Sequence, residues 1–514
     1  MLLRSALRTG LAVAAAALSV SALVALPATA PSAHAAGAAR SVNVMAPLFI
    51  DDWASGGPQW RDFTSSLAVA DAQGADAVAV DVWWGKAEPA LGSFDWAYYD
   101  KVFAAVTAAG LDLVPVMSFH QCGGNVGDTC DIPIPSFVWE PFQICGFAGW
   151  CTSTPVENYW VSEYGNTDRE SPSPWGIGND RTLLEMRDFM NAFEGHYTSG
   201  ATDYRGRIQE ITVGTGPAGE LRYPSYAAHD SKVAGNPAGY PNRGTFQSYT
   251  PAAVRSFADW AVAKYGSVAG VGSAWGIPGL VYTAISPPTD HERFIDSGSY
   301  SSLQYGRDFT RWYADSLLQH GREVVSAAIG AFDEGFSAVP LGLKIPGVHW
   351  QTMSSSPIRR APEIAAGLIS TDGAYNDAST SHGYDGILGL VHDLDVNGDG
   401  HSTSHRVILH FTALEMPDGR EWDGGAHAYS DSASLVSWVG SAAAKAHVTL
   451  KGENALSSGL GSVGSSTTVG WSHIRDAFSG STAYSGLTLL RLSDVVVPAS
   501  TGRTEFERFL RDFH

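Results

Sequence analysis

The stretch AVAVDVWW at residues 77–84 is apolar almost from end to end, with Asp81 as its one charged residue. Near-continuous apolarity, in place of strict alternation, is typical of strands that are covered on both faces in a parallel sheet. Seven more runs of this kind recur along the chain, at residues 42–50, 111–119, 208–214, 341–350, 407–412, 447–452 and 487–492. The sequence therefore predicts eight buried strands.

Helical patterns lie between these runs. In two segments the apolar residues are spaced so that they share one helical face. They are Tyr99, Val102, Phe103 and Val106 in the first segment, and Phe309, Trp312, Tyr313 and Leu317 in the second. Eight strands that alternate with helices predict an α/β fold, namely a closed (β/α)8 TIM barrel with long βα loops that form the active-site cleft. An open doubly wound sheet has the same local pattern and is the alternative.

Polar side chains follow the predicted strands where these end. They are Asp81, His120, Glu220, His349, Thr412, Glu453 and Arg491. In a barrel, this end of the strands holds the active site. The longest interruption, residues 226–301, is expected to be an elaborated loop that walls the cleft. Since no repeat or linker divides the chain, we expect a single catalytic domain at residues 42–514, without a carbohydrate-binding module.

The first 35 residues have the features of a secretory signal peptide. Arg4 and Arg8 precede an apolar run at residues 11–26, and Ala33-His34-Ala35 offers a cleavage site between small residues. Residues 36–41 then form a short spacer. A membrane anchor is disfavoured because no second long apolar segment follows. We expect a secreted, extracellular protein.

Composition excludes some partners. The net charge of −20 and a pI of about 5.1 disfavour nucleic acid and anionic membranes, because both would repel the chain. Aromatic residues make up 11% of the sequence, and Trp and Tyr rings suit a cleft that stacks on the apolar face of a sugar. A neutral polymer is compatible with both observations.

The four cysteines, Cys122, Cys130, Cys145 and Cys151, lie within thirty residues of one another. In an exported protein, an even and local set favours disulfides, with three possible connectivities. The pairs Cys122–Cys130 and Cys145–Cys151 are favoured because short loops close with the least loss of entropy. A zinc site is the alternative, although no pair has the usual ligand spacing.

Two glutamates carry the chemistry. Glu220 lies in GTGPAGELRYPSY and Glu453 in KGENAL, each just after a predicted strand. Cleavage of a glycosidic bond requires two such carboxyl groups, one to protonate the leaving oxygen and one to activate water or attack the sugar. Lys451, Asn454 and Arg491 are candidates to keep Glu453 ionised. The alternative is that these are two unrelated glutamates on the protein surface.

The sequence motifs around these glutamates closely resemble those of the β-amylases, which are exo-acting glycoside hydrolases that release maltose from α-1,4-glucans with inversion. Seven motifs occur in the same order as in the family, and together they cover the chain from near residue 42 to its end. They are VDVWWG (80–85), SFHQCGGNVGD (118–128), GPAGELRYPSY (216–226), GVHW (347–350), FTALEM (411–416), GENAL (452–456) and LRLSD (490–494).

The resemblance implies a role for each matching residue, with Glu220 as the general acid and Glu453 as the general base. The implied sugar contacts are Asp81, His120 and Asp128 on one side of the scissile bond, Lys344 and His349 on the other, and Thr412, Asn454, Ala455, Leu456 and Arg491 around the base. The Gly-rich residues 123–128 would form a lid, stapled at its base by Cys122–Cys130. Inversion would set the two carboxyl groups roughly 6.5–9.5 Å apart.

The resemblance also implies starch, amylose and maltooligosaccharides as substrates, a monomer, and no cofactor for catalysis. A structural calcium ion is expected from Glu88, Glu185 and Asp188, although Gly92 and Ser93 replace other ligands. A second calcium candidate begins at Asp395, but its twelfth position is Arg406 in place of Glu. A catalytically silent glucan-binding protein and an endo-acting or differently linked glucanase are the alternative functions.

Overall fold

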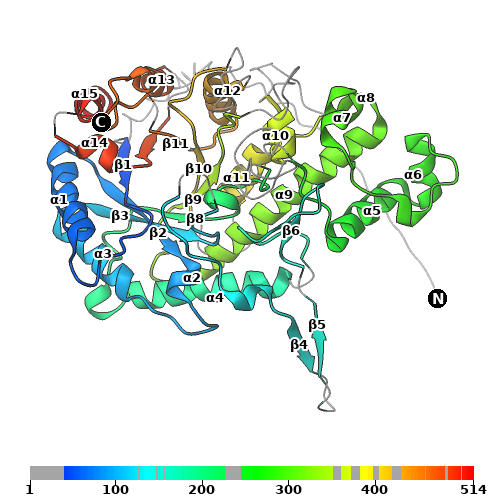
Figure 1. Ribbon diagram of the computed structural model, residues 1–514, viewed down its shortest axis with the longest axis horizontal. Helices are drawn as coiled ribbons and strands as arrows, with labels where there is room; N and C mark the ends of the chain where they lie inside the picture. The colour runs from blue at the N-terminus through cyan, green and yellow to red at the C-terminus, as the bar shows by residue number, and fades with distance from the viewer. Residues whose placement is uncertain are drawn as a thin grey trace, which may run out of the picture. The chain divides into compact units, whose positions relative to one another are not determined.

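Eight parallel strands close into a barrel in chain order, with the last strand paired to the first. They are β1 (Ser41–Met45), β2 (Ala77–Trp83), β3 (Asp112–Ser118), β8 (Ile211–Val213), β9 (Leu341–Ile345), β10 (Val407–Phe411), β11 (Leu450–Glu453) and β12 (Gly486–Leu489). Each of the eight predicted runs contains one of these strands or overlaps it. The closed barrel is therefore confirmed, and the open sheet is not found (Figure 1).

The computed structural model describes residues 40–124, 128–145, 149, 151–155, 157–176, 179–225, 245–350, 361–371, 382–397, 405–419, 430–457, 459–480, 484–498 and 500–514. Residues Arg40–His514 form one compact unit. The predicted signal peptide and nearly all of the predicted spacer lie outside the described residues.

The sequence of β2 explains how the barrel is filled. Side chains of a strand alternate between its two faces. Val78, Val80 and Val82 join the main hydrophobic core, whereas the small Ala77 and Ala79 belong to a separate cluster. That second cluster contains, besides the two alanines, Met45 of β1 and Val114 of β3. The valines thus face the surrounding helices, and the alanines face the barrel interior, in line with Asp81.

Eight helices follow the strands in turn: α1 (Pro58–Gln73), α3 (Ala97–Ala108), α4 (Asn179–Tyr197), α9 (Gln304–Ala331), α11 (Asp385–Asn397), α12 (Ser432–Lys445), α13 (Val469–Ala477) and α15 (Thr501–Phe513). The two predicted apolar faces are buried, in α3 and in α9. Short helices α2 (Trp84–Ala87), α10 (Ala361–Ala365) and α14 (Ser493–Val496) add single turns. Among the described residues, no helix is both long and apolar enough to cross a bilayer.

The connection from β3 to α4 contains two hairpins that the sequence did not predict. They are β4 (Phe142–Cys145) with β5 (Cys151–Thr154), and β6 (Trp160–Val161) with β7 (Thr167–Asp168). The β4–β5 hairpin projects away from the barrel (Figure 1). Both favoured disulfides are confirmed: Cys145–Cys151 joins β4 to β5, and Cys122–Cys130 closes a short loop after β3.

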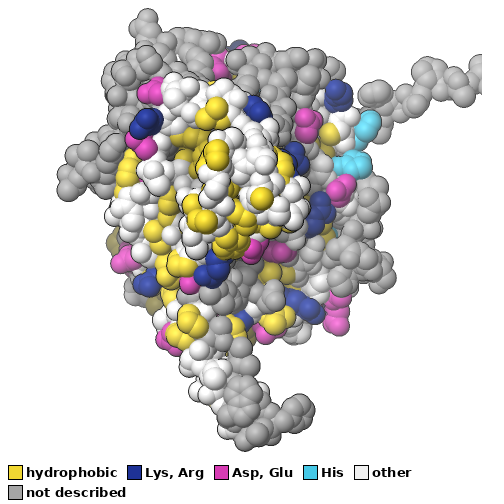
Figure 2. All heavy atoms as spheres, turned by 90° about the vertical axis from the view of Figure 1, so that its right-hand side faces the viewer, with side chains coloured by type: hydrophobic (Ala, Val, Ile, Leu, Met, Phe, Trp, Pro, Cys, Tyr) yellow, Lys and Arg dark blue, Asp and Glu magenta, His cyan; other side chains and the backbone are white. Residues whose placement is uncertain are grey.

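In residues 245–301, the described part of the interruption at residues 226–301, helices are found where the sequence predicted a loop. Its described part contains the helices α5 (Pro251–Tyr265), α6 (Val268–Trp275), α7 (His291–Asp296) and α8 (Ser299–Ser302). Thr250 and Ser267 cap the first two by accepting hydrogen bonds from backbone amides. Figure 2 shows apolar side chains gathered on this face, among which Ile277, Val281, Tyr282 and Leu303 are exposed.

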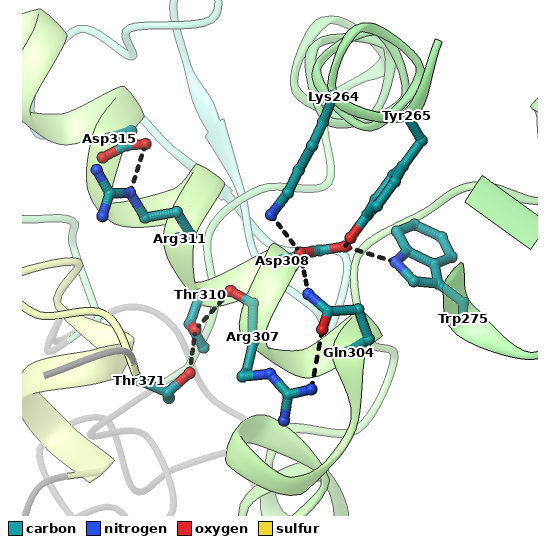
Figure 3. A network of polar contacts seen from close by, with 10 residues as sticks. All are labelled: Lys264, Tyr265, Trp275, Gln304, Arg307, Asp308, Thr310, Arg311, Asp315 and Thr371. Atoms are coloured by element: carbon teal, nitrogen blue, oxygen red, sulfur yellow. Dashed lines mark hydrogen bonds and ion pairs between the residues drawn. The ribbon is translucent and has the colours of Figure 1, made fainter. Parts of the chain in front are cut away.

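A buried carboxylate ties these helices to α9. Asp308 is fully buried and accepts hydrogen bonds from four side chains, which are Lys264 (2.7 Å), Tyr265 (2.8 Å), Trp275 (2.7 Å) and Gln304 (2.8 Å). Figure 3 shows the donors converging on it from α5, α6 and α9. Burial opposes ionisation, but the four donors outweigh it and lower the pKa of Asp308. The insertion is thereby fixed to the barrel.

Candidate active site

A ring of polar side chains lies at the carboxyl ends of the barrel strands. Asp81 is near the end of β2, Lys344 is in β9, Thr412 follows β10, and Glu453 is the last residue of β11. All four are at least nine-tenths buried. Glu220 follows β8 and pairs with Lys344 through an isolated parallel bridge. The structure therefore brings the two predicted catalytic glutamates to the same end of the barrel.

A tight turn positions Glu220. Ala218 (φ 57°) and Gly219 (φ 74°) both adopt left-handed conformations within the short helix Pro217–Gly219. Such backbone is costly for a residue with a side chain, so Ala218 is held there by the surrounding structure. The chain then becomes extended at Glu220, and the Leu221 amide donates to the Lys344 carbonyl at 2.7 Å. The turn thus places the Glu220 side chain beside β9.

Both oxygens of the Glu220 carboxylate accept hydrogen bonds. The Nε of Arg222 donates to Oε2 at 2.8 Å, and the Thr412 hydroxyl donates to Oε1 at 3.0 Å. Thr412 in turn accepts a hydrogen bond from the Gly347 amide at 2.9 Å. Sequence reasoning missed Arg222. The signal available was its position two residues after Glu220, because residues two apart in extended chain share a face.

Lys344 is the cation that pairs with Glu453. Its Nζ lies 2.8 Å from Oε2 of Glu453, and both side chains are more than nine-tenths buried. Burial pushes the pKa of Lys344 down, but the charges of Glu453, Asp81 and Glu220 outweigh that effect and raise it. Lys344 is therefore a buried ammonium group that stays charged among three carboxyl groups.

The three cation or donor candidates named for Glu453 do other things. Lys451 forms an ion pair with Glu210 at 2.6 Å. Asn454 bridges backbone groups, donating to the Leu456 carbonyl and accepting from the Leu490 amide. The described interactions of Arg491, which is exposed, involve Glu415 and Asp494. The expectation for Lys451 was wrong because its side chain extends toward a different carboxylate.

Asp81 has an unusual protonation equilibrium. Burial raises the pKa of its carboxyl group to about 6, against the opposing effects of the hydroxyl of Ser118 and the charge of Lys344. The Ser118 hydroxyl donates to Oδ1 at 2.7 Å. The negative charges of Glu453 and Asp128 add to the rise. Asp81 thus belongs electrostatically to the same group as the predicted base.

His120 is a neutral imidazole at the edge of this group. Burial lowers the pKa of its ring to about 3, and the charges of Lys344 and Arg222 lower it further. The ring meets Trp83 edge to face at 5.0 Å and lies against Gly219, next to Glu220. Its Nδ1 is buried and has no hydrogen-bond partner within the described part of the chain. A neutral ring with an unused polar atom suits contact with a hydroxyl group.

A buried glutamate supports the loop after Glu453. Glu415 accepts hydrogen bonds from the backbone amides of Ala455 (3.0 Å) and Leu456 (2.6 Å). Burial raises the pKa of Glu415 to about 7, although these two donors act in the opposite direction. The predicted contacts Asn454, Ala455 and Leu456 therefore share one fixed loop. Glu415 lies in the motif FTALEM, but the sequence did not reveal that it supports the loop after Glu453.

Two predicted contacts are only partly defined. The Asp128 carboxylate accepts a hydrogen bond from the Gly123 amide at 2.9 Å, but residues 125–127 of the predicted lid lie outside the described residues. The Nδ1 of His349 lies 3.0 Å from the Gly347 carbonyl, on the segment after β9. Both residues are near strand ends that carry the ring of polar side chains.

Two of the three expected calcium ligands, Glu88 and Glu185, have protein partners. Glu88 accepts hydrogen bonds from Trp84 and from the Gly92 amide, both at 2.7 Å, and Arg181 forms an ion pair with Glu185 at 2.7 Å. Asp188 is exposed. Within the described residues, no three His, Cys, Asp or Glu side chains are grouped so that they could hold a metal ion. Burial raises the pKa of Glu185 to about 7, and the negative charges of Glu88 and Asp188 add to the rise. Calcium binding by these residues stays a prediction.

The second calcium candidate is mostly undescribed. Asp395 lies in α11 and its carboxylate accepts a hydrogen bond from the Val407 amide at 2.9 Å. Residues 398–404, which include most of the remaining candidate ligands, lie outside the described residues.

Comparison with known proteins identifies the family. A profile described as Glycosyl hydrolase family 14 matches residues 43–513. The chain belongs to glycosyl hydrolase family 14. The resemblance to the β-amylases is thereby confirmed, and so is the expectation of a glycoside hydrolase.

Relatives within family 14 share about a third of the sequence. A thermophilic β-amylase of Thermoanaerobacterium thermosulfurigenes is 34% identical over 449 residues, which are 87% of this chain and 70% of the relative. A β-amylase of Bacillus cereus is 36% identical over 401 residues, 78% of this chain and 63% of the relative. The matched region thus spans about two thirds of these relatives' length.

A solved family 14 structure shares the fold. The catalytic domain of β-amylase from Paenibacillus polymyxa aligns with a TM-score of 0.71 at 32% identity, covering 92% of this chain and 98% of that domain. The barrel described above is therefore that of the family.

Proposed function

We propose that this chain hydrolyses starch-like α-1,4-glucans from their non-reducing ends, releasing β-maltose with inversion. Membership of family 14 supports starch hydrolysis. The observation that supports the finer proposal is the ion pair of Lys344 with Glu453 at 2.8 Å. Lys344 also forms a backbone bridge with Glu220. Two carboxyl groups from distant parts of the sequence thereby face one polar region at the mouth of the barrel.

In this mechanism, Glu220 acts as the general acid and Glu453 as the general base. Glu220 donates its proton to the glycosidic oxygen while the bond between that oxygen and the anomeric carbon breaks. A water molecule attacks the anomeric carbon from the opposite face and gives its proton to Glu453. Protons balance between the two carboxyl groups and water, so the hydrolysis as written needs no cofactor.

Lys344 and Arg222 serve the two glutamates differently. Lys344 places a positive charge 2.8 Å from Glu453, the residue proposed as the base. Arg222 and Thr412 fix the direction of the Glu220 carboxyl group from two sides. Each glutamate therefore has its own polar partner, and orientation of this kind lowers the entropic barrier of the reaction.

Subsite contacts come from the neighbouring polar groups. Asp81 accepts hydrogen bonds from sugar hydroxyls when ionised, and His120 offers a neutral ring. Asp128, His349, Asn454, Ala455, Leu456 and Arg491 keep the roles that the family resemblance implies. We infer that the protein is secreted and acts as a monomer on starch, amylose and maltooligosaccharides. The first 35 residues and the two disulfides support secretion.

The test is the product profile on soluble starch with two isosteric variants. Glu220→Gln and Glu453→Gln should each lower kcat by roughly 10²–10⁴-fold, because each removes one proton transfer. Glu334→Gln, an exposed site elsewhere, should keep the parent rate. Maltose should be the first product, whereas a ladder of oligosaccharides would indicate an endo-acting enzyme. Binding of amylose without release of sugar would indicate a silent glucan-binding protein.

A further inference from the structure

A cavity of about 380 Å³ lies between α5 and α9, on residues that the mechanism does not use. Its volume is within the range of small-molecule sites, roughly 300–1,000 Å³. On α9 the lining residues recur every three or four positions from Trp312 to Glu323, so they share one face of the helix. Ser256 and Trp260, four residues apart on α5, line it as well.

Three tryptophans make the apolar part of this cavity. Trp175 stacks on Trp312 with ring centroids 5.2 Å apart and planes within 19°. Trp312 also donates a hydrogen bond to the Ser256 hydroxyl at 3.2 Å, which fixes its ring. Trp260 is only partly buried, and the ammonium group of Lys264 lies 4.9 Å from its ring centroid. Trp175 and Trp312 are buried, so Trp260 is the indole ring that offers apolar surface to a ligand.

The rest of the lining is polar and carries acceptors. Asp315 and Glu323 are half-buried carboxylates, and Ser316 and Gln319 add a hydroxyl and an amide. The lining, all of it within the described residues, contains no lysine or arginine, which disfavours an anionic ligand. Figure 3 shows Asp315 turned toward Arg311, whose Nε donates to it at 2.8 Å.

His320 supplies a buried acceptor in the same lining. Its Nε2 donates to the Thr215 carbonyl at 2.7 Å, and burial lowers the pKa of the ring, so that the neutral form carries its hydrogen on Nε2. Nδ1 is then an acceptor, and it has no hydrogen-bond partner among the residues that the structure describes. Thr215 lies in the segment that leads to Glu220, so the cavity wall contacts the catalytic segment.

We propose that this cavity is an accessory binding site for a neutral oligosaccharide. A pyranose ring has an apolar face for an indole ring and hydroxyl groups for carboxylate, amide and imidazole acceptors. An organic cation would also suit aromatic rings and carboxylates, but Arg311 already neutralises Asp315 and the Lys264 ammonium lies over Trp260. That the saccharide is an α-1,4-glucan rests on the proposed function.

The experiment measures maltotetraose binding by calorimetry to the full chain carrying Glu453→Gln, which is not expected to hydrolyse it. Two binding sites should be seen. Adding Trp260→Ala should weaken one of them at least about tenfold, corresponding to ~1.4 kcal/mol, and leave the other unchanged. Trp60→Ala is the matched control, because Trp60 is also half-buried under a lysine, with Lys101 4.5 Å from its ring centroid. That control should keep both sites.

A second variant, which fills the cavity, keeps the test valid if Trp260→Ala does not fold. Ser316→Tyr places a ring in the cavity and should also abolish the second site. A single binding site in the starting protein would overturn the proposal, and so would two unaltered sites in both cavity variants. Binding of tetramethylammonium in place of maltotetraose would assign the cavity to cations and overturn it too. Hydrolysis of maltotetraose by the Glu453→Gln protein would count against the proposed function alone.

Discussion

Two buried ionic clusters lie one above the other inside the barrel, and they differ in how their charges are balanced. The lower cluster is Glu210 with His410 and Lys451, in which one carboxylate contacts two basic groups. The upper cluster surrounds Lys344, whose ammonium group lies among three carboxyl groups, one of which, Glu220, also pairs with Arg222. His410 precedes Thr412 by two residues and Lys451 precedes Glu453 by two, so the same strand faces build both clusters.

The protonation equilibria of the two clusters follow from this balance. Burial alone would raise the pKa of Glu210, but His410 and Lys451 outweigh it and lower the pKa to about 2. Burial raises the pKa of Asp81 in the upper cluster to about 6, because the Ser118 hydroxyl and the charge of Lys344 do not compensate for it. A satisfied carboxylate stabilises the fold, whereas an unsatisfied one is available to a substrate.

The largest expected effect comes from removing the cation of the upper cluster. Lys344→Met should lower kcat by about 10²–10³-fold, the cost of losing one preorganised charge in an active site. The physical reason is that Glu453 would lose its partner at 2.8 Å. Starch assays measure this, with Lys445→Met in the last turn of α12 as the exposed control. A variant that keeps parental kcat would contradict the assignment of Lys344.

Removing the carboxylate of the lower cluster should act on stability instead. Glu210→Gln leaves Lys451 and His410 without their buried partner, which costs about 3 kcal/mol of unfolding free energy. Urea denaturation measures this change. Asp393→Asn, in an exposed pair with Arg322, should change stability by less than about 1 kcal/mol. A Glu210→Gln protein with parental stability and a greatly lowered kcat would contradict the structural role of the lower cluster.

The two clusters should respond to pH with opposite signs. The pKa of Asp81 is raised in the folded state, from 3.8 to about 6, so its contribution to stability falls as the pH rises through that range. The pKa of Glu210 is lowered from 4.5 to about 2, so its contribution is present above pH 4.5 and is lost as the pH falls toward 2. Denaturation can be followed across pH 2.5–7. Asp81→Asn should lack the fall in stability as the pH rises toward 6, and Glu210→Gln should lack the fall in stability as the pH drops toward 2. Parallel curves for parent and variants would contradict this.

The smallest effect is expected at Glu415, which supports the loop after the base. Glu415→Gln keeps Oε1, which accepts from both backbone amides, but replaces Oε2, the second acceptor of the Ala455 amide, with an amide donor, at a cost of about 1 kcal/mol. Because the loop carries Ala455 and Leu456, KM for maltooligosaccharides should rise a few-fold while kcat changes less. Steady-state kinetics separate the two parameters. An unchanged KM would mean that the loop keeps its position without Glu415.

The barrel could be predicted from the sequence because its signal is local. In β2 the apolar run, its length and the position of Asp81 all follow from neighbouring residues. The helical insertion between α5 and α8 was less accessible, since the pattern of long gaps between strands does not distinguish loops from short helices. The β4–β5 hairpin was missed for the same reason, although the disulfide across it was predicted.

The partners of the predicted site residues could not be found in this way. Lys344 and Glu453 are 109 residues apart in the sequence, and only closure of the barrel brings them together. The sequence offered Lys451, Asn454 and Arg491 without a ranking, and Lys451 pairs with Glu210. The interaction of Arg222 with Glu220 is local, yet its geometry depends on the left-handed turn at Ala218.

The most direct test of the account is the anomeric form of the first maltose released from amylose, followed by proton NMR within the first minutes of reaction. An acid and a base that act on opposite faces of one sugar predict β-maltose, which then equilibrates with the α anomer. Initial release of α-maltose would show retention, and it would contradict the roles given to Glu220 and Glu453.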